Sequence, residues 1–206
     1  MPEPAEEWYE RVTRAVGEGG QRPAAWPASP SYPLNDSGSL RPMSPPAPEP
    51  AREGEGGVGC LICSRSRVED PSGYICWRDE LTMLGVPFQP TALPLVTYLM
   101  PRRHADLGDL TRQEAARCGE LLTYLERAAC DVLDVPRVQV ARYGEGVEHL
   151  HWWVLARPTR ALDLRGGHLF LWDQVLPARD DAARRADLDL LAARLVELAG
   201  GEALSG

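Results

Sequence analysis

Two histidines stand two residues apart, at His149 and His151, in the stretch EHLHWWVLARP (148–158), and they are half of the four histidines in the chain. Because side chains alternate between the two faces of a β-strand, both histidines share one face with Trp153, while the residues between them form an apolar face suited to a core. Two neighbouring imidazoles favour a metal-ligand or catalytic pair over a merely packed strand.

A second signal is the pair Cys60-Leu-Ile-Cys63, whose two thiolates could bind one zinc ion from a single tight turn. The chain has no second CxxC, so histidines would have to supply the other two ligands. His104, which ends the segment MPRRH, and His149 are the candidates. The alternatives are two small buried thiols or a redox pair, although the βαβ pattern expected around a redox CxxC is absent.

The composition indicates a globular protein with room for one domain and a remainder, since the 206 residues are 44% hydrophobic and 25% charged. A net charge of -8 argues against broad nucleic-acid binding. No apolar run is long enough to span a membrane, and the start MPEPAEEWYERV lacks the pattern of a signal peptide. We therefore expect a cytoplasmic protein whose cysteines are free or bound to metal.

The first 57 residues are rich in Pro, Ala, Gly and Glu, and we expect them to be largely disordered, with the folded domain over 58–206. Within them, residues 5–16 could form a short helix. The aromatic residues of this part could also cover the domain, although disorder is the favoured expectation; they are Trp8, Tyr9, Trp26 and Tyr32.

Runs of β-branched and aromatic residues predict the strands. They cover 74–77, 93–100, 137–142, 147–155 and 168–172.

Two helices are predicted from apolar periodicity and capping residues. Thr111 and Glu114 form a capping box before a helix of about 22 residues that carries Cys118 on its apolar stripe. A final helix follows Pro177 and is stopped by the glycines at 200 and 201. The order of strands, helix, strands and helix predicts an α+β domain with an antiparallel sheet and two main helices.

The order of these motifs resembles the histidine-triad (HIT) family. The resemblance covers roughly residues 59–158 and depends on CxxC at 60–63, MPRRH followed by LxxLT, the amphipathic helix, and VEHLHWWVLARP. It implies a small sheet with two helices, a homodimer, and a nucleotide or nucleotidyl conjugate as the ligand. Family enzymes hydrolyse or transfer nucleoside monophosphates, and the middle histidine of the motif becomes transiently nucleotidylated.

Carried over to this sequence, the resemblance makes His151 the nucleophile. It also makes a closed, structural zinc site of Cys60, Cys63, His104 and His149, with no open position for substrate.

The triad is divergent, because this chain has Trp153 where the family has histidine or glutamine. It also has Glu145 where the family commonly has a glutamine that contacts phosphate, and Gly146 where many members have a serine or threonine that assists the leaving group. A carboxylate facing a phosphate is repulsive, so the usual phosphate contacts are altered.

Two functions follow from this pattern. The first is an enzyme, with Glu145 as a general acid or base and with Trp153, Arg142 and Arg157 contacting substrate. The second is a zinc-stabilised binding protein that has lost catalysis. A solvated turn residue is the simpler interpretation of Glu145, and surface charge is the simpler interpretation of the arginines.

Overall fold

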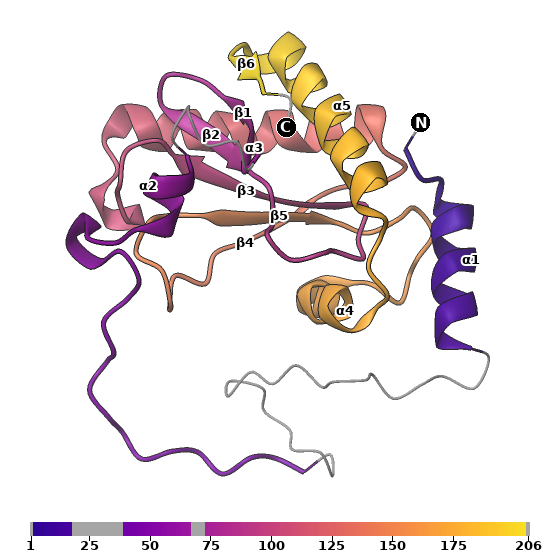
Figure 1. Ribbon diagram of the computed structural model, residues 1–206, viewed down its shortest axis with the longest axis horizontal. Helices are drawn as coiled ribbons and strands as arrows, with labels where there is room; N and C mark the ends of the chain where they lie inside the picture. The colour runs from indigo at the N-terminus through magenta and orange to yellow at the C-terminus, as the bar shows by residue number, and fades with distance from the viewer. Residues whose placement is uncertain (1, 18–38, 67–72, 205–206) are drawn as a thin grey trace.

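A computed structural model describes residues 2–17, 39–66 and 73–204 of the chain. Six antiparallel strands form one sheet in the order β4-β5-β3-β2-β1-β6 (Figure 1). The predicted α+β class with an antiparallel sheet is confirmed. None of the described helices is long and apolar enough to cross a membrane. The strands are β1 Ile75–Arg78, β2 Thr82–Gly85, β3 Leu95–Pro101, β4 Gln139–Ala141, β5 Trp152–Ala156 and β6 Glu202–Ala203.

One face of the sheet is covered by the two long helices, α3 (Arg112–Val132) and α5 (Asp181–Ala199). The largest hydrophobic cluster lies here and joins strand residues such as Leu99 and Val154 to helix residues such as Leu125. The predicted capping box is present: the Thr111 hydroxyl accepts the N–H of Glu114, whose carboxylate accepts the N–H of Thr111. The predicted stop of α5 is also confirmed, at Gly200 with φ 76°.

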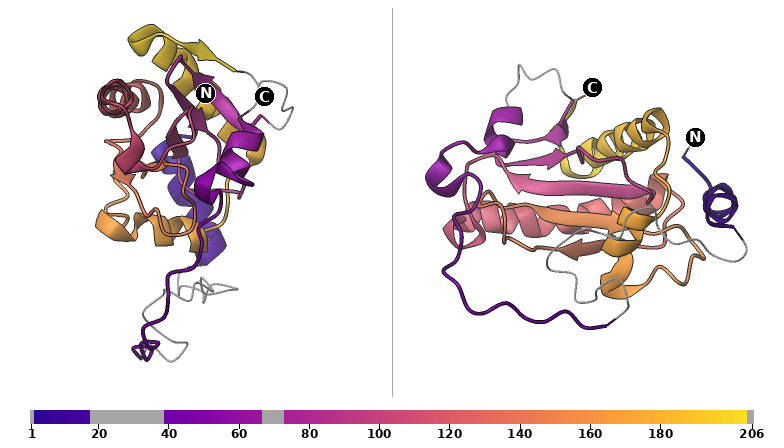
Figure 2. Two further views of the ribbon diagram at one scale, coloured as in Figure 1. Left: turned by 90° about the vertical axis from the view of Figure 1, so that its left-hand side faces the viewer. Right: turned by 60° about the horizontal axis from the view of Figure 1, so that its bottom comes forward.

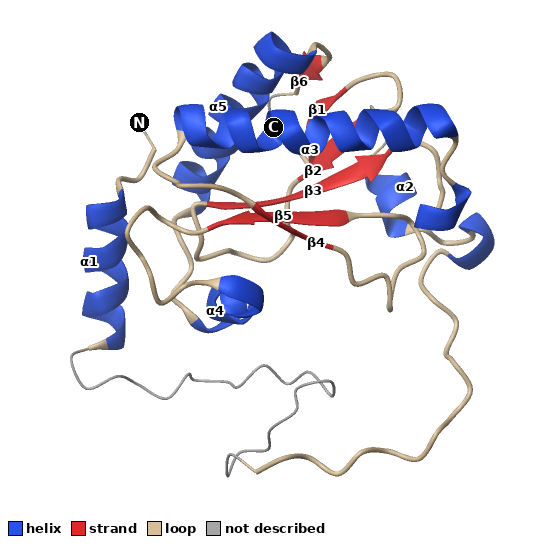
Figure 3. Cartoon of the chain, turned by 180° about the vertical axis from the view of Figure 1, so that it is seen from behind, coloured by secondary structure: helices blue, strands red, loops and turns tan. Residues whose placement is uncertain are grey.

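Three short helices lie on the opposite face: α1 (Ala5–Val16), α2 (Leu61–Arg65) and α4 (Leu169–Val175). In Figures 1 and 3, α4 lies on the other side of β4 and β5 from α3, and α1 runs beside it. Figure 2 shows α2 across the sheet from α3. Two separate clusters fill this face, one around Leu155 under α1 and α4, the other around Met100 under α2.

Two strand predictions need correction. The run HLFLW at 168–172 is not a strand: it continues the short 3-10 helix η3 (Gly166–His168) into α4. A short apolar run fits a buried helix as well as a strand, and here one side of α4 packs Leu169 against the sheet. The strand expected over 147–155 begins only at Trp152, because residues before it bond to loops: the Leu150 N–H donates to the Ala105 carbonyl.

The hairpin of β1 and β2 was missed, and its turn explains why it forms. The Asp79 carboxylate accepts the N–H groups of Leu81 and Thr82, which closes a tight turn between the two strands. The residues of β2 are ordinary for a strand, but the strand is only four residues long, which makes it hard to recognise from the sequence.

The helix considered over 5–16 is present as α1, and Trp8 is buried in the sheet-facing cluster while Tyr9 is exposed. Trp26 and Tyr32 lie outside the described residues. The domain boundary at 57/58 stays a prediction.

Candidate metal centre and histidine pocket

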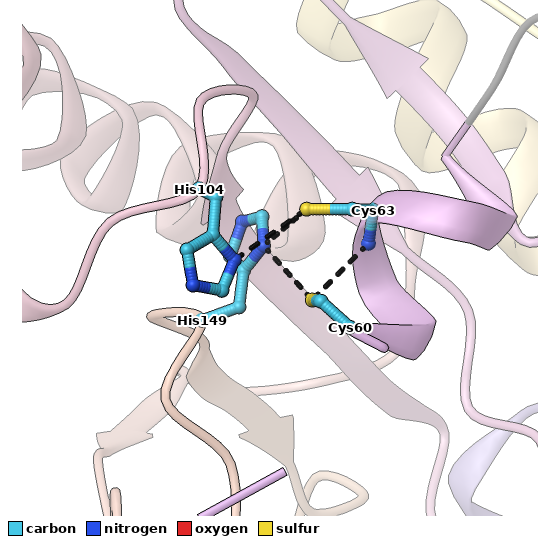
Figure 4. A group of neighbouring side chains, drawn as sticks. All are labelled: Cys60, Cys63, His104 and His149. Carbon is cyan, nitrogen blue, oxygen red and sulfur yellow. Dashed lines mark hydrogen bonds between the residues drawn. The ribbon is translucent and has the colours of Figure 1, made fainter. Parts of the chain in front are cut away.

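Four metal-ligating side chains from three distant parts of the chain meet under α2 (Figure 4). Cys60 caps the N-terminus of α2 and Cys63 lies within it, His104 follows β3, and His149 precedes β5. One ligand atom from each residue lies within 4.8 Å of the others. The predicted set of four residues therefore forms a cluster that could hold a metal ion.

The spacing inside the cluster suits a tetrahedral ion. The Nδ1 atom of His149 lies 3.6 Å from the Cys60 Sγ and 3.3 Å from the Cys63 Sγ, and the His104 Nδ1 lies 3.5 Å from the Cys63 Sγ. Zinc–sulfur bonds of about 2.3 Å and zinc–nitrogen bonds of about 2.0 Å, arranged as a tetrahedron, require roughly 3.5 Å between S and N ligands. Two thiolates and two imidazoles are also a donor set that zinc prefers.

Both imidazoles are oriented by a bond at the other ring nitrogen. The Nε2 atom of His149 lies 2.9 Å from the Pro101 carbonyl oxygen, and the Nε2 atom of His104 lies 2.9 Å from the Glu148 carboxylate. Since these partners only accept, each Nε2 carries the proton and each Nδ1 presents its lone pair to the cysteines. Burial lowers the pKa of His149 to about 4, which favours the neutral, ligating form.

The segment before α2 is joined to the loop that carries His149. A parallel β-bridge pairs Glu53 with Val147, and the Glu148 carboxylate accepts the N–H of Gly56. The Arg52 guanidinium lies between the carboxylates of Asp106 and Glu148. Hydrogen bonding from His104 is the first cause that lowers the pKa of Glu148. The metal cluster is thus supported by charged and backbone contacts around it.

His151 lies next to the cluster but faces a different space. Its Nδ1 atom lies 2.9 Å from the backbone oxygen of His149, so Nδ1 must carry the proton and Nε2 is left with its lone pair. The side chain lines a pocket of about 270 Å³ together with Trp153 and Glu53. The rest of the lining is apolar or aromatic: Leu61, Ile62, Tyr74, Phe88, Tyr98 and Val147.

The other predicted site residues lie apart from this pocket. Glu145 is exposed and lines a separate hollow with Arg142, whose guanidinium is paired with Asp106. Arg157 lies beyond the end of β5, where it donates to the Pro158 carbonyl, and burial lowers its pKa. The pocket therefore joins His151 to Trp153, whereas Glu145 and the two arginines do not line it.

Several residues of the site were not predicted from the sequence. Tyr98 and Phe88 are two of them, although aromatic residues near a predicted strand are a usable signal for a pocket wall. The contacts of Glu148 could not be inferred, because they depend on where the loop before α2 runs.

Burial raises the pKa of Tyr98 to about 12, so its phenol is neutral at pH 7.

Comparison with solved structures identifies the fold. A hypothetical histidine-triad nucleotide-binding protein from Sulfolobus tokodaii matches 70% of this chain and 99% of its own, with 14% identity and a TM-score of 0.52. The chain has a HIT-like fold. A zinc-bound histidine-triad protein from Mycobacterium smegmatis matches 68% of this chain and 94% of its own, with 23% identity and a TM-score of 0.48.

A histidine-triad protein from Bradyrhizobium japonicum matches 58% of this chain and 88% of its own, with 22% identity and a TM-score of 0.48. No protein-family model matches the chain, and no curated protein matches its sequence. All three of these identities are below 25%, so the comparisons show the fold alone.

Proposed function

We propose that this HIT-like domain is a hydrolase or transferase of nucleotidyl groups that uses His151 as its nucleophile. The observation that carries the proposal is the bond from the His151 Nδ1 to the His149 carbonyl, which leaves the Nε2 lone pair available in a side chain that lines a pocket. A neutral imidazole held in one tautomer is an effective nucleophile near pH 7. The HIT-like fold supports a nucleotide as the ligand.

The reaction would proceed in two displacements. The His151 Nε2 attacks the α-phosphorus of a nucleotidyl conjugate; the N–P bond forms as the bond from phosphorus to the leaving oxygen or nitrogen breaks, and the leaving group takes up a proton. Water, or an acceptor hydroxyl, then attacks the same phosphorus and loses its proton. The nucleotide is released and the His151 imidazole is restored.

Zinc is the metal that we propose for Cys60, Cys63, His104 and His149, because their donor types and spacing fit it. With all four positions taken by protein, the ion would supply structural cross-linking rather than Lewis-acid activation of substrate. Through His149 the site also supports the nucleophile: the ring of His149 is fixed at both nitrogens, and its backbone carbonyl is the partner of His151.

The phosphate contacts are the weak part of the enzyme hypothesis. Among the described residues that line the pocket there is no arginine or lysine, and Glu53 adds a carboxylate. This favours the second candidate, a zinc-stabilised binding protein without turnover. Under the enzyme hypothesis Glu145 acts as the acid or base, and Arg142 and Arg157 contact the substrate. Because these three residues lie outside the His151 pocket, these roles require a substrate that extends beyond it. We further propose that the protein is a cytoplasmic homodimer. Light scattering can measure the mass of the particle in solution and so test the dimer.

The deciding experiment traps the intermediate. Purified protein is offered diadenosine polyphosphates, adenosine phosphoramidate and nucleotide sugars, and His151 is examined by mass spectrometry for a nucleotidyl adduct. We expect the adduct and nucleotide release in the native chain, with a loss of at least ~10³-fold in rate for His151→Ala. His168→Ala is the matched control, because His168 is exposed on η3.

The binding-protein alternative predicts stoichiometric zinc and nucleotide binding, with no adduct and the same background hydrolysis in the native chain and in His151→Ala. That outcome would reject the enzyme hypothesis while retaining the metal site.

A further inference from the structure

One wall of the His151 pocket, Trp153, contacts a residue outside the segment that resembles the family. Trp153 lines the pocket, and its ring meets Tyr98 on one side, with ring centroids 4.7 Å apart at an interplanar angle of 85°. Phe170 of α4 makes a second edge-to-face contact with the same indole, at 4.7 Å and 82°. Tyr143 lies 5.7 Å from Phe170 and completes the aromatic group. Phe170 itself does not line the pocket.

The helix that carries Phe170 is held firmly against the sheet. The Asp173 carboxylate accepts the N–H groups of Ala92 and Leu93, at 2.7 and 3.0 Å, just before β3 begins. Leu169 is 1% exposed and packs in the same cluster as Leu93. The Ala92 carbonyl in turn accepts the indole N–H of Trp8 at 2.8 Å, so α1 is bound to the same loop. Phe170 therefore has little freedom to move away from Trp153.

We propose that Phe170 is a positioning residue that determines the specificity of the His151 pocket, because it fixes the indole of Trp153 as a rigid wall. A fixed wall limits the size of the group that can lie beside His151, so the pocket accepts a compact group there and excludes a bulky one. Removal of the Phe170 ring leaves a void on one side of the indole. The indole then moves into that void and the pocket opens.

Access to His151 can be measured without any turnover, with diethyl pyrocarbonate as the probe. The His151 Nε2 attacks a carbonyl carbon of the reagent; the N–C bond forms, a C–O bond breaks, and ethyl carbonate leaves and decays to ethanol and carbon dioxide while the imidazolium loses its Nδ1 proton. The rate of this carbethoxylation is followed by peptide mass spectrometry on the full chain, relative to His168, which is exposed in the same protein.

In Phe170→Ala we expect the relative rate of carbethoxylation at His151 to rise at least about tenfold, the lower end of the ~10–200-fold effects of small changes in apolar pockets. Phe170→Tyr keeps the ring contact and should keep the native rate. The matched control is Trp172→Ala, on the same helix but 37% exposed, which should also leave the rate unchanged. Equal rates in the native chain, Phe170→Ala and Trp172→Ala, at unchanged circular dichroism and metal content, overturn the proposal.

If Phe170→Ala does not fold, Phe170→Leu replaces it, since leucine retains apolar volume without the edge-to-face contact. We then expect carbethoxylation of His151 to be faster in Phe170→Leu than in the native chain. A rate equal to that of the native chain overturns the proposal.

The part that concerns substrate choice rests on the proposed function. If nucleotide release is observed, Phe170→Ala should change the ratio of kcat/KM for bulky over compact leaving groups by about tenfold. That change should appear mainly in KM, because His151 and its bond to His149 are untouched. The carbethoxylation result stands whether or not turnover is found, so failure of the proposed function and failure of the wall are distinguishable.

Discussion

The two faces of the sheet are built in different ways. The face under α3 and α5 is covered by two long helices, each continuous in sequence, and one large cluster fills it. The opposite face is covered by α1, α2 and α4, which come from three separate parts of the chain and leave two smaller clusters. The metal cluster and the His151 pocket both lie on this second face, where α2 and β5 approach each other.

The difference shows how the fold separates stability from chemistry. The long helix α3 buries a continuous apolar stripe in the large cluster. Polar bonds also join it to α5: Arg194 donates to the Asp131 carboxylate and Arg117 donates to the Ala199 carbonyl. The short helices of the second face come from separate parts of the chain, and specific bonds fix them too, such as those of Trp8 and Asp173 to the loop before β3. A face assembled from such pieces leaves space between them, and that space is the pocket.

The largest effect that we expect comes from the metal. At free zinc about a thousandfold above its Kd, the ion would stabilise the native state by about 4 kcal/mol. For a domain of this size that corresponds to roughly 8–16 °C in Tm. Calorimetry with and without a chelator measures this, and Cys63→Ser should abolish the difference.

The control for the metal experiment is Cys130→Ser, because Cys130 is an exposed thiol outside the cluster. A chelator that leaves Tm unchanged in the native chain, with no zinc found by elemental analysis, would show that no metal contributes to the stability of the second face.

The second prediction concerns α1. Trp8→Ala removes a ring that is 3% exposed together with its bond to the Ala92 carbonyl, and we expect a loss of about 3 kcal/mol in the free energy of unfolding. Leu125→Ala, in the cluster under α3, should cost a similar ~2–5 kcal/mol. Urea unfolding measures both.

Tyr9→Ala is the matched control for Trp8→Ala, since Tyr9 lies on the same helix and is 62% exposed. If the two variants unfold at the same urea concentration, α1 does not belong to the core of the second face. The contribution of the second face to the free energy of unfolding would then be smaller than the contacts of Trp8 suggest.

The smallest effect is the pH dependence of the α3 cap. The Arg103 guanidinium, with further bonds from Thr111, lowers the pKa of Glu114 to about 2 from its ordinary 4.5. Between these values the unfolded state binds more protons, so the stabilisation by Glu114 is full above pH 4.5 and is lost as the pH falls toward 2. Glu114→Ala should therefore cost about 1 kcal/mol at pH 7, the size of a helix cap, and almost nothing near pH 2.

Denaturant unfolding of both proteins across this pH range gives the difference directly. A cost of Glu114→Ala that stays constant from pH 7 to pH 2 would contradict the bond between Glu114 and Arg103.

Patterns local in sequence were enough for the long helices of the first face and for the two cysteines of the metal cluster. The capping box at Thr111 and the leucine periodicity behind it predicted α3, because a helix is determined by residues three and four positions apart. The CxxC spacing predicted two ligands on one turn; His104 and His149 were candidates for the other two, and the resemblance to the HIT family completed the set that the structure brings together. Within β5 the alternation holds, since Trp152 and Val154 pack in the large cluster while Trp153 lines the pocket; His149 and His151 precede the strand and face different spaces.

Only the tertiary structure decided what surrounds Trp153. The run HLFLW predicted a strand, yet it forms α4, because packing against the sheet chose between two conformations that the apolar run allows equally. That choice placed Phe170 against Trp153, 17 residues away in sequence. The sequence by itself shows that position 153 departs from the usual triad residue. The contacts that hold Trp153 beside the His151 pocket join distant segments of the chain, and no local pattern encodes such contacts.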